Sequence, residues 1–107
     1  MKNLTDEALL RQLGYTQTTG IVEKLKLIIH KTEGYEDIKR HLLALHDNIK
    51  LHNSFVGISS SEDFFKIKNE NNSQEASQYI KKWANKYNIN LQKVAGKETY
   101  YITGKAV

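Results

Sequence analysis

The sequence predicts an α+β domain in which three N-terminal helices precede a β-β-α-β-β unit, with one amphipathic helix packed on an antiparallel sheet. Three observations predict it. Apolar residues recur at helical spacing up to residue 53, alternation begins after it, and a strongly amphipathic stretch at 72–88 separates two alternating segments. A chain of 107 residues suits one hydrophobic core. We therefore expect a single domain (1–107) with a helical part (1–53) and a sheet-containing part (54–104).

The stretch 72–88 is the clearest helix in the sequence. Its apolar residues fall on one helical face, and they are Ala76, Tyr79, Ile80, Trp83, Ala84 and Tyr87. Asn72 and Glu75 have the spacing of a capping box, and Asn88 suits a left-handed helix end. Trp83 is the only tryptophan of the chain, so we expect it at the centre of the core.

The first helix is predicted to begin after Thr5, a good N-cap, and to end at Gly14. There Tyr15 can fold back on Leu10 in a Schellman ending. The second helix is predicted from about residue 18 to residue 32. Its apolar stripe is Ile21, Val22, Leu25, Ile28 and Ile29, and Gly34 ends it.

The third helix is predicted to open at Glu36 and Asp37 and to end at His52 and Asn53. Its apolar seam repeats at steps of three and four, which suits packing along another helix. The seam consists of Tyr35, Ile38, Leu42, Leu45 and Ile49, and Leu43 and Leu51 widen it.

Four strands are predicted at 54–59, 64–68, 91–95 and 98–103. Between the last two, Gly96-Lys97 predicts a two-residue type II′ hairpin turn. Alternation then assigns residues to two faces of this hairpin. One face would hold Leu91, Tyr100 and Ile102, and the other Val94 and Tyr101.

The amino-acid composition excludes several kinds of functional site. Cysteine is absent, which excludes disulfides, thiolate metal sites and cysteine nucleophiles. Apolar runs stay well short of the roughly 20 residues that span a bilayer, so we expect no membrane contact and a cytoplasmic protein. The net charge is +4, with the basic excess mainly in the second half, which is weaker than the dense basic surface of a dedicated nucleic-acid binder.

The first candidate site is the N-terminal helix pair. Residues 6–25 lead from one helix through Leu13-Gly14-Tyr15 into a polar run, Thr16, Gln17, Thr18 and Thr19, whose side chains can bond phosphates or base edges. This segment resembles the helix-turn-helix pattern of bacterial regulators, which implies DNA binding. It departs from that pattern at Gly20, where an apolar residue is expected, and in lacking arginine in the second helix. The alternative is an ordinary helical hairpin.

The second candidate is a basic surface in the C-terminal half. Lysines on strands can neutralise phosphates while tyrosines beside them stack on bases. The residues predicted to do so are Lys66, Lys68, Lys81, Lys82, Lys86, Lys93, Lys97 and Tyr100. The alternative is that these lysines only keep the surface soluble. Convergence of the lysines on one face would favour nucleic-acid binding, and scattering would favour a protein partner.

Catalytic and metal chemistry find little support in the sequence. His41 and His46 are five residues apart, which suits a helical metal pair poorly, and neither His30 nor His52 completes a ligand set. The acidic residues come as adjacent pairs that suit helix starts and turns. We therefore expect no metal, no cofactor and no enzymatic activity.

The leading hypothesis from the sequence is a small basic regulatory protein that contacts nucleic acid through the N-terminal helix pair or the lysine-bearing sheet. The alternative is a protein-binding adaptor or inhibitor that does not contact nucleic acid. In that case the helical part, or a strand edge at 54–59, would receive a partner or a second copy of the chain.

Overall fold

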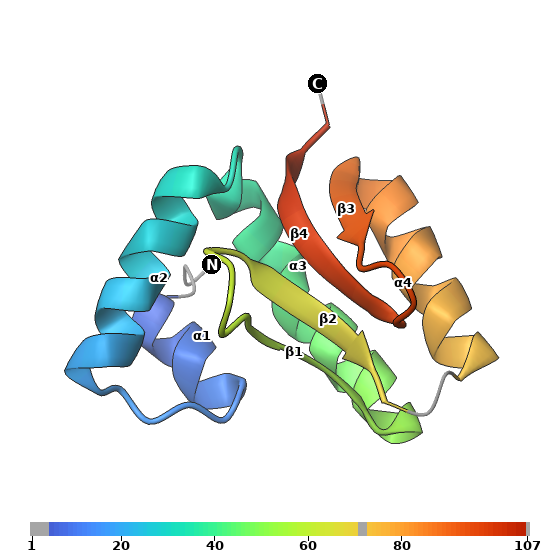
Figure 1. The fold of residues 1–107 in the computed structure, drawn as a ribbon, viewed down its shortest axis with the longest axis horizontal. Helices are drawn as coiled ribbons and strands as arrows, with labels where there is room; N and C mark the ends of the chain where they lie inside the picture. The colour runs from blue at the N-terminus through green and yellow to red at the C-terminus, as the bar shows by residue number, and fades with distance from the viewer. Residues whose placement is uncertain (1–4, 71–72, 107) are drawn as a thin grey trace.

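The computed structural model describes residues 5–70 and 73–106 and confirms the α+β class (Figure 1). Its elements in chain order are α1 (Asp6–Gln12), α2 (Thr19–Lys31), α3 (Tyr35–Ile49), the 3-10 turn η1 (Lys50–His52), β1 (Ser54–Ile58), β2 (Phe65–Asn69), α4 (Gln74–Tyr87), β3 (Ile89–Lys93) and β4 (Thr99–Lys105). The sheet is antiparallel with the strand order β1-β2-β4-β3, so the last strand lies between β2 and β3.

The predicted ends of α1 are confirmed. The Thr5 hydroxyl accepts the backbone N–H of Ala8 at 3.1 Å. Gly14 has a φ of 92°, and the N–H of Tyr15 donates to the carbonyl of Leu10 at 2.9 Å, which is the Schellman pattern. This ending directs Tyr15 away from α1 and toward the sheet.

The seam of α3 is confirmed, because all five predicted residues are buried. The predicted end is also correct, since Asn53 adopts a left-handed conformation after η1. Leu51 is different. It was predicted to widen the apolar face, yet its side chain is 78% exposed. The reason is that η1 tightens the backbone after Ile49, so residues there no longer follow the helical spacing.

Helix α4 agrees with the sequence in its stripe and its end. Trp83 is 4% exposed, and its indole N–H donates to the carbonyl of His41 at 3.0 Å, which joins α4 to α3. Asn88 has a φ of 55° and ends the helix. The cap differs from the prediction: the hydroxyl of Ser73 accepts the N–H of Ala76. The predicted partner, Asn72, lies outside the described residues.

The predicted two-residue turn between β3 and β4 is wrong. The N–H of Val94 donates to the carbonyl of Thr99, so the four residues 95–98 connect the two strands. Within this loop the N–H of Lys97 donates to the carbonyl of Val94, which closes a turn over residues 94–97. Gly96 has a φ of 75° in this loop. Glycine is therefore the third residue of the 94–97 turn, where a positive φ is required, and not the first residue of a type II′ turn.

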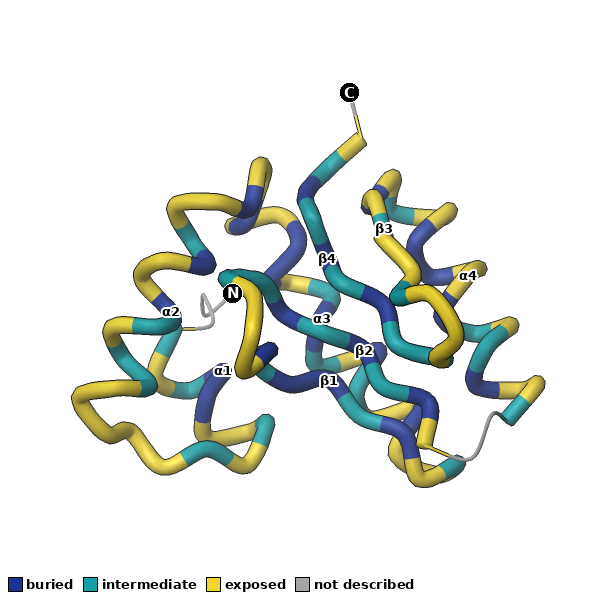
Figure 2. The backbone as a smooth tube through the Cα atoms, viewed as in Figure 1, coloured by how far each residue is buried: buried dark blue, intermediate teal, exposed yellow. Residues whose placement is uncertain are grey.

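Helices α3 and α4 pack on one face of the sheet, and alternation decides which strand residues meet them (Figures 1 and 2). Phe65, Ile67, Tyr100 and Ile102 are buried against the helices. The residues between them point away from the helices, with Lys66 opposite Tyr101 and Lys68 opposite Thr99 in the register of β2 and β4. The sheet therefore has a second face that α3 and α4 leave open.

Candidate functional site

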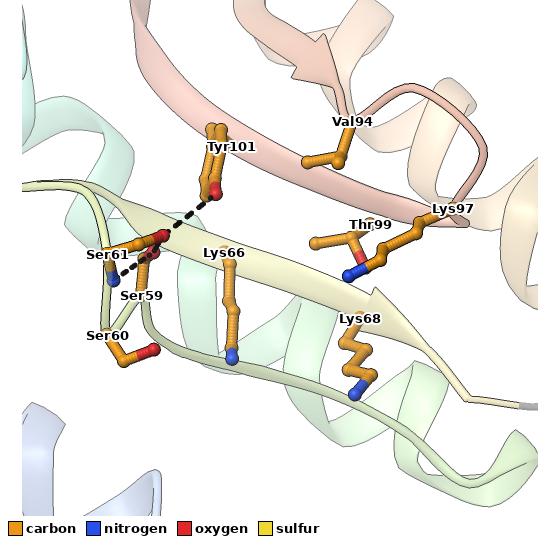
Figure 3. Close-up of a pocket in the computed structure, with 9 residues that line it drawn as sticks. All are labelled: Ser59, Ser60, Ser61, Lys66, Lys68, Val94, Lys97, Thr99 and Tyr101. Atoms are coloured by element: carbon orange, nitrogen blue, oxygen red, sulfur yellow. Dashed lines mark hydrogen bonds between the residues drawn. The ribbon is translucent and has the colours of Figure 1, made fainter.

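The open face of the sheet contains a hollow of about 260 Å³ (Figure 3). We call it the lysine hollow, and it is lined by Ser59, Ser60, Ser61, Lys66, Lys68, Val94, Lys97, Thr99 and Tyr101. Figure 3 shows Lys66 and Lys68 extending from β2 and Lys97 reaching toward Thr99 from the β3–β4 loop. Three lysines and five hydroxyl-bearing residues thus line one hollow, and its lining includes no carboxylate.

One wall of the lysine hollow is the serine loop between β1 and β2. The buried Ser59 hydroxyl accepts the backbone N–H groups of Ser61 at 3.3 Å and Glu62 at 3.1 Å, which fixes the turn. The Ser61 hydroxyl lies 3.4 Å from the hydroxyl oxygen of Tyr101. Hydrogen bonds to Ser61 and then Ser59 lower the pKa of Tyr101, and Lys66 lowers it further. The loop therefore orients the Tyr101 ring at the edge of the hollow.

The charges of the lysine hollow are only partly neutralised. Lys68 forms an ion pair with Glu70, with 3.3 Å between its ammonium nitrogen and Oε1. Within residues 5–70 and 73–106, neither Lys66 nor Lys97 forms an ion pair. The ammonium groups of Lys66 and Lys97 are therefore left to attract an anion. Lys68 can bind an anion only if it releases Glu70.

Aromatic rings adjoin the lysine hollow. The ring centroids of Phe64 and Tyr101 lie 6.3 Å apart at a tilt of 38°, and the ammonium group of Lys31 lies 5.0 Å from the centroid of Phe64. Both rings are only partly buried. A planar ligand group can therefore stack on the open face beside the lysines.

The structure places Tyr100, which was predicted to bind nucleic acid, on the opposite face. Its side chain is 4% exposed, and its hydroxyl donates to Oε2 of Glu98 at 2.9 Å. Burial raises the pKa of Tyr100. Its neighbour Tyr101 faces the lysine hollow instead, as the alternation of β4 requires.

The seven predicted lysines do not all share one surface. Lys66, Lys68 and Lys97 converge on the lysine hollow, whereas Lys81, Lys82 and Lys86 lie on the exposed face of α4. Lys82 and Lys86 line a separate hollow of about 180 Å³ between α3 and α4. Lys93 is exposed at the end of the edge strand β3 and does not line the lysine hollow.

The N-terminal polar run is exposed, but its side chains mainly hold the local backbone. The Thr18 hydroxyl accepts the N–H of Ile21 at 3.2 Å as the N-cap of α2, and Gln17 donates to the carbonyl of Glu7 at 3.3 Å. Thr16 and Thr19 flank this pair and are exposed at the surface. The connection between α1 and α2 spans residues 13–18, longer than the turn of three or four residues typical of a helix-turn-helix.

The histidines have local structural contacts. His41 stacks on Tyr87 with centroids 3.6 Å apart, and Nδ1 of His46 accepts the N–H of Val56 at 3.2 Å. His52 lies 3.4 Å from a carboxylate oxygen of Glu75. Among residues 5–70 and 73–106 there is no group of three or more metal-ligating side chains.

Sequence reasoning missed part of the lysine hollow. Neither the serine loop nor Thr99 was predicted to belong to a binding site. Alternation placed Tyr101 on the same face as Val94, but only the pairing of β2 with β4 sets it opposite Lys66. No local signal places the serines beside Tyr101, since the two segments are separated by 40 residues.

Comparison of the chain with protein-family models, with curated proteins and with solved structures found no match. In the described part of the chain, no helix has the length and apolar character needed to cross a membrane.

Proposed function

We propose that the protein is a non-enzymatic, nucleic-acid-binding regulatory module that uses the open face of its sheet. The observation behind the proposal is the lysine hollow itself, which Lys66, Lys68, Lys97 and Tyr101 line together without a carboxylate. Ammonium groups attract phosphates, serine hydroxyls bond phosphate oxygens, and an aromatic ring accepts a stacked base. These three groups together match the chemistry of a nucleotide chain.

A polyanion fits this surface better than a small anion. Lys66 and Lys68 are successive outward residues of one strand, so their backbone positions are about 7 Å apart. Lys97 adds a third charge from the neighbouring loop. A row of charges across an open surface suits a ligand that repeats its own charge, which a nucleic-acid backbone does.

The hollow offers little for catalysis. Its lining residues include no histidine and no carboxylate, the side chains that most often transfer protons in enzymes. We therefore propose binding without chemical conversion of the ligand.

The test is fluorescence anisotropy with short single-stranded RNA and DNA at increasing salt. A variant with Lys66→Gln, Lys68→Gln and Lys97→Gln should bind weakly, and its salt slope should be shallower by roughly 2, because each phosphate contact contributes about 0.7 on single strands. The matched control is Lys81→Gln, Lys82→Gln and Lys86→Gln, which removes the same charge from α4. Equal losses in both variants, or no binding by the unmodified protein, would refute the proposal.

The second candidate function is protein binding. Two observations favour it: Leu51 and Leu27 are 78% and 51% exposed, and four of the predicted lysines lie outside the lysine hollow. A partner protein, or a second copy of the chain, would bind the helical part (1–53), where both exposed leucines lie. The edge of β1 is a poorer site, because side chains of Tyr15 and His46 already bond its outward N–H groups. Sedimentation velocity across protein concentrations would detect self-association.

A further inference from the structure

A second hollow, of about 380 Å³, adjoins the lysine hollow. We call it the α2–β1 hollow, because it lies between the first turn of α2 and the end of β1. Ser59 and Ser60 line both hollows, so the serine loop is their common wall. Figure 3 shows this loop along one side of the lysine hollow. A ligand held by the lysines can therefore reach the α2–β1 hollow by passing over Ser60, which is exposed.

The two hollows differ in chemistry. The α2–β1 hollow is lined mainly by apolar surface, to which Ile21 and Ile58 contribute aliphatic side chains and Tyr15 an aromatic ring. Its one cation, Lys24, is already paired with Asp63 at 3.0 Å. This hollow thus suits an uncharged planar group, whereas the lysine hollow suits a phosphate.

The α2–β1 hollow also presents a hydroxyl group. The Tyr15 oxygen accepts the backbone N–H of Ile58 at 2.7 Å, which holds the ring in place. Within the described residues, the Tyr15 proton has no acceptor, so it can donate to a ligand. An apolar surface with one fixed donor matches the face and the edge of a nucleobase.

We propose that the α2–β1 hollow is a base-binding subsite for the strand whose phosphates occupy the lysine hollow. This inference rests on the proposed function. It narrows the ligand to single-stranded nucleic acid, because a base in a duplex is paired and stacked and would have to leave the duplex to enter the hollow.

Gly20 allows the subsite to be blocked without disturbing the fold. It lines the α2–β1 hollow, and a Cβ atom placed on it would have no neighbour within 4 Å. The substitution Gly20→Leu therefore adds a side chain to open space and replaces a poor helix former with a good one. Gly20→Ala is the matched control, since it changes the same backbone position but leaves most of the hollow empty.

The experiment measures the affinities of the unmodified protein, Gly20→Leu and Gly20→Ala for an oligothymidylate and for an abasic strand with the same number of phosphates. Melting curves check that each variant is folded. The unmodified protein and Gly20→Ala should prefer the oligothymidylate by about ten-fold or more, because each stacked base contributes roughly ten-fold in affinity. Gly20→Leu should lose the part of this preference that the α2–β1 hollow supplies, about ten-fold in affinity for the oligothymidylate, with its affinity for the abasic strand unchanged.

Two results would overturn the inference: equal affinity of the unmodified protein for both strands, or a preference in Gly20→Leu as large as in Gly20→Ala. The first result, if binding still depends on salt and on Lys66, leaves the phosphate contacts of the proposed function standing but not the stacking of a base on Tyr101. Failure of both strands to bind would refute the proposed function and the subsite together.

Discussion

The imidazole of His46 and the backbone of Val56 form a hydrogen bond across an edge of the sheet, with 3.2 Å between Nδ1 and the amide nitrogen. Two residues further along β1, the Tyr15 hydroxyl accepts the N–H of Ile58 in the same way. Strand β1 is an edge strand, and its outward N–H groups would otherwise be free to pair with another chain. Side chains from α3 and from the α1–α2 connection thus protect this edge.

The His46 contact predicts a pH-dependent stability. Burial lowers the pKa of His46, Asp47 raises it and Lys50 lowers it, with a net shift below the ordinary value. The unfolded chain therefore binds protons more readily than the folded one. The stability that neutral His46 contributes is fully present above about pH 6.5, the pKa of histidine in the unfolded chain. It is lost as the pH falls through the pKa of His46 in the folded protein. Urea unfolding between neutral and mildly acidic pH should show this loss.

The substitution His46→Gln should reduce that pH dependence and cost about 1 kcal/mol near neutral pH, the usual contribution of one hydrogen bond. Burial also lowers the pKa of His41, so part of the pH dependence of stability will remain in this variant. His30→Gln changes an exposed side chain and serves as the control. An unchanged pH profile in His46→Gln would show that the contact with Val56 has no energetic effect.

Gly20→Ala and Gly104→Ala should change the free energy of unfolding in opposite directions. Gly20 lies in a helix with open space around it, so alanine should stabilise by about 0.5 kcal/mol. Gly104 has a φ of 152°, and its Cβ would lie 3.1 Å from the backbone of Glu33. Alanine there should destabilise by about 2 kcal/mol or more. Thermal melts of the two variants provide the comparison, and shifts of the same sign would contradict it.

Trp83→Phe should destabilise the protein by about 2 kcal/mol, because it removes buried ring area and the indole hydrogen bond that joins α4 to the carbonyl of His41 in α3. Trp83→Ala should cost about 3–5 kcal/mol. Since Trp83 is the only tryptophan, unfolding of these variants is best followed by circular dichroism. Tyr79→Phe, on the partly exposed side of α4, is the control and should change stability little.

Asp63→Asn should strengthen oligonucleotide binding. Asp63 contacts Lys24 at 3.0 Å and Lys31 at 4.0 Å, so its removal leaves two cations unpaired beside the serine loop. We expect the affinity for an oligonucleotide at low salt to increase about three-fold, because surface ion pairs contribute about 1 kcal/mol or less. Glu36→Gln makes the same charge change on α3, where its partner is Lys39. Equal effects of the two substitutions would indicate a response to net charge alone.

Local patterns predicted the helices well, because each cap and stripe involves residues close together in the chain. Thr5, Gly14 and Asn88 were assigned correctly for this reason. The turn at residues 94–97 was assigned incorrectly, because the position of Gly96 within it depends on where the pairing of β3 and β4 ends. Leu51 was misassigned because the change from α-helix to 3-10 geometry leaves no clear mark in the sequence.

The sequence alone determined that helix α4 buries its aromatic stripe and that β2 alternates lysines with apolar residues, because both are periodicities of one element. Only the tertiary structure decided which lysines act together. Inserting β4 between β2 and β3 sets Tyr101 opposite Lys66 and brings the serine loop to it, while α4 places its own lysines elsewhere. The physical reason is that strand order and helix placement follow from packing one shared core, in which segments far apart in the chain meet.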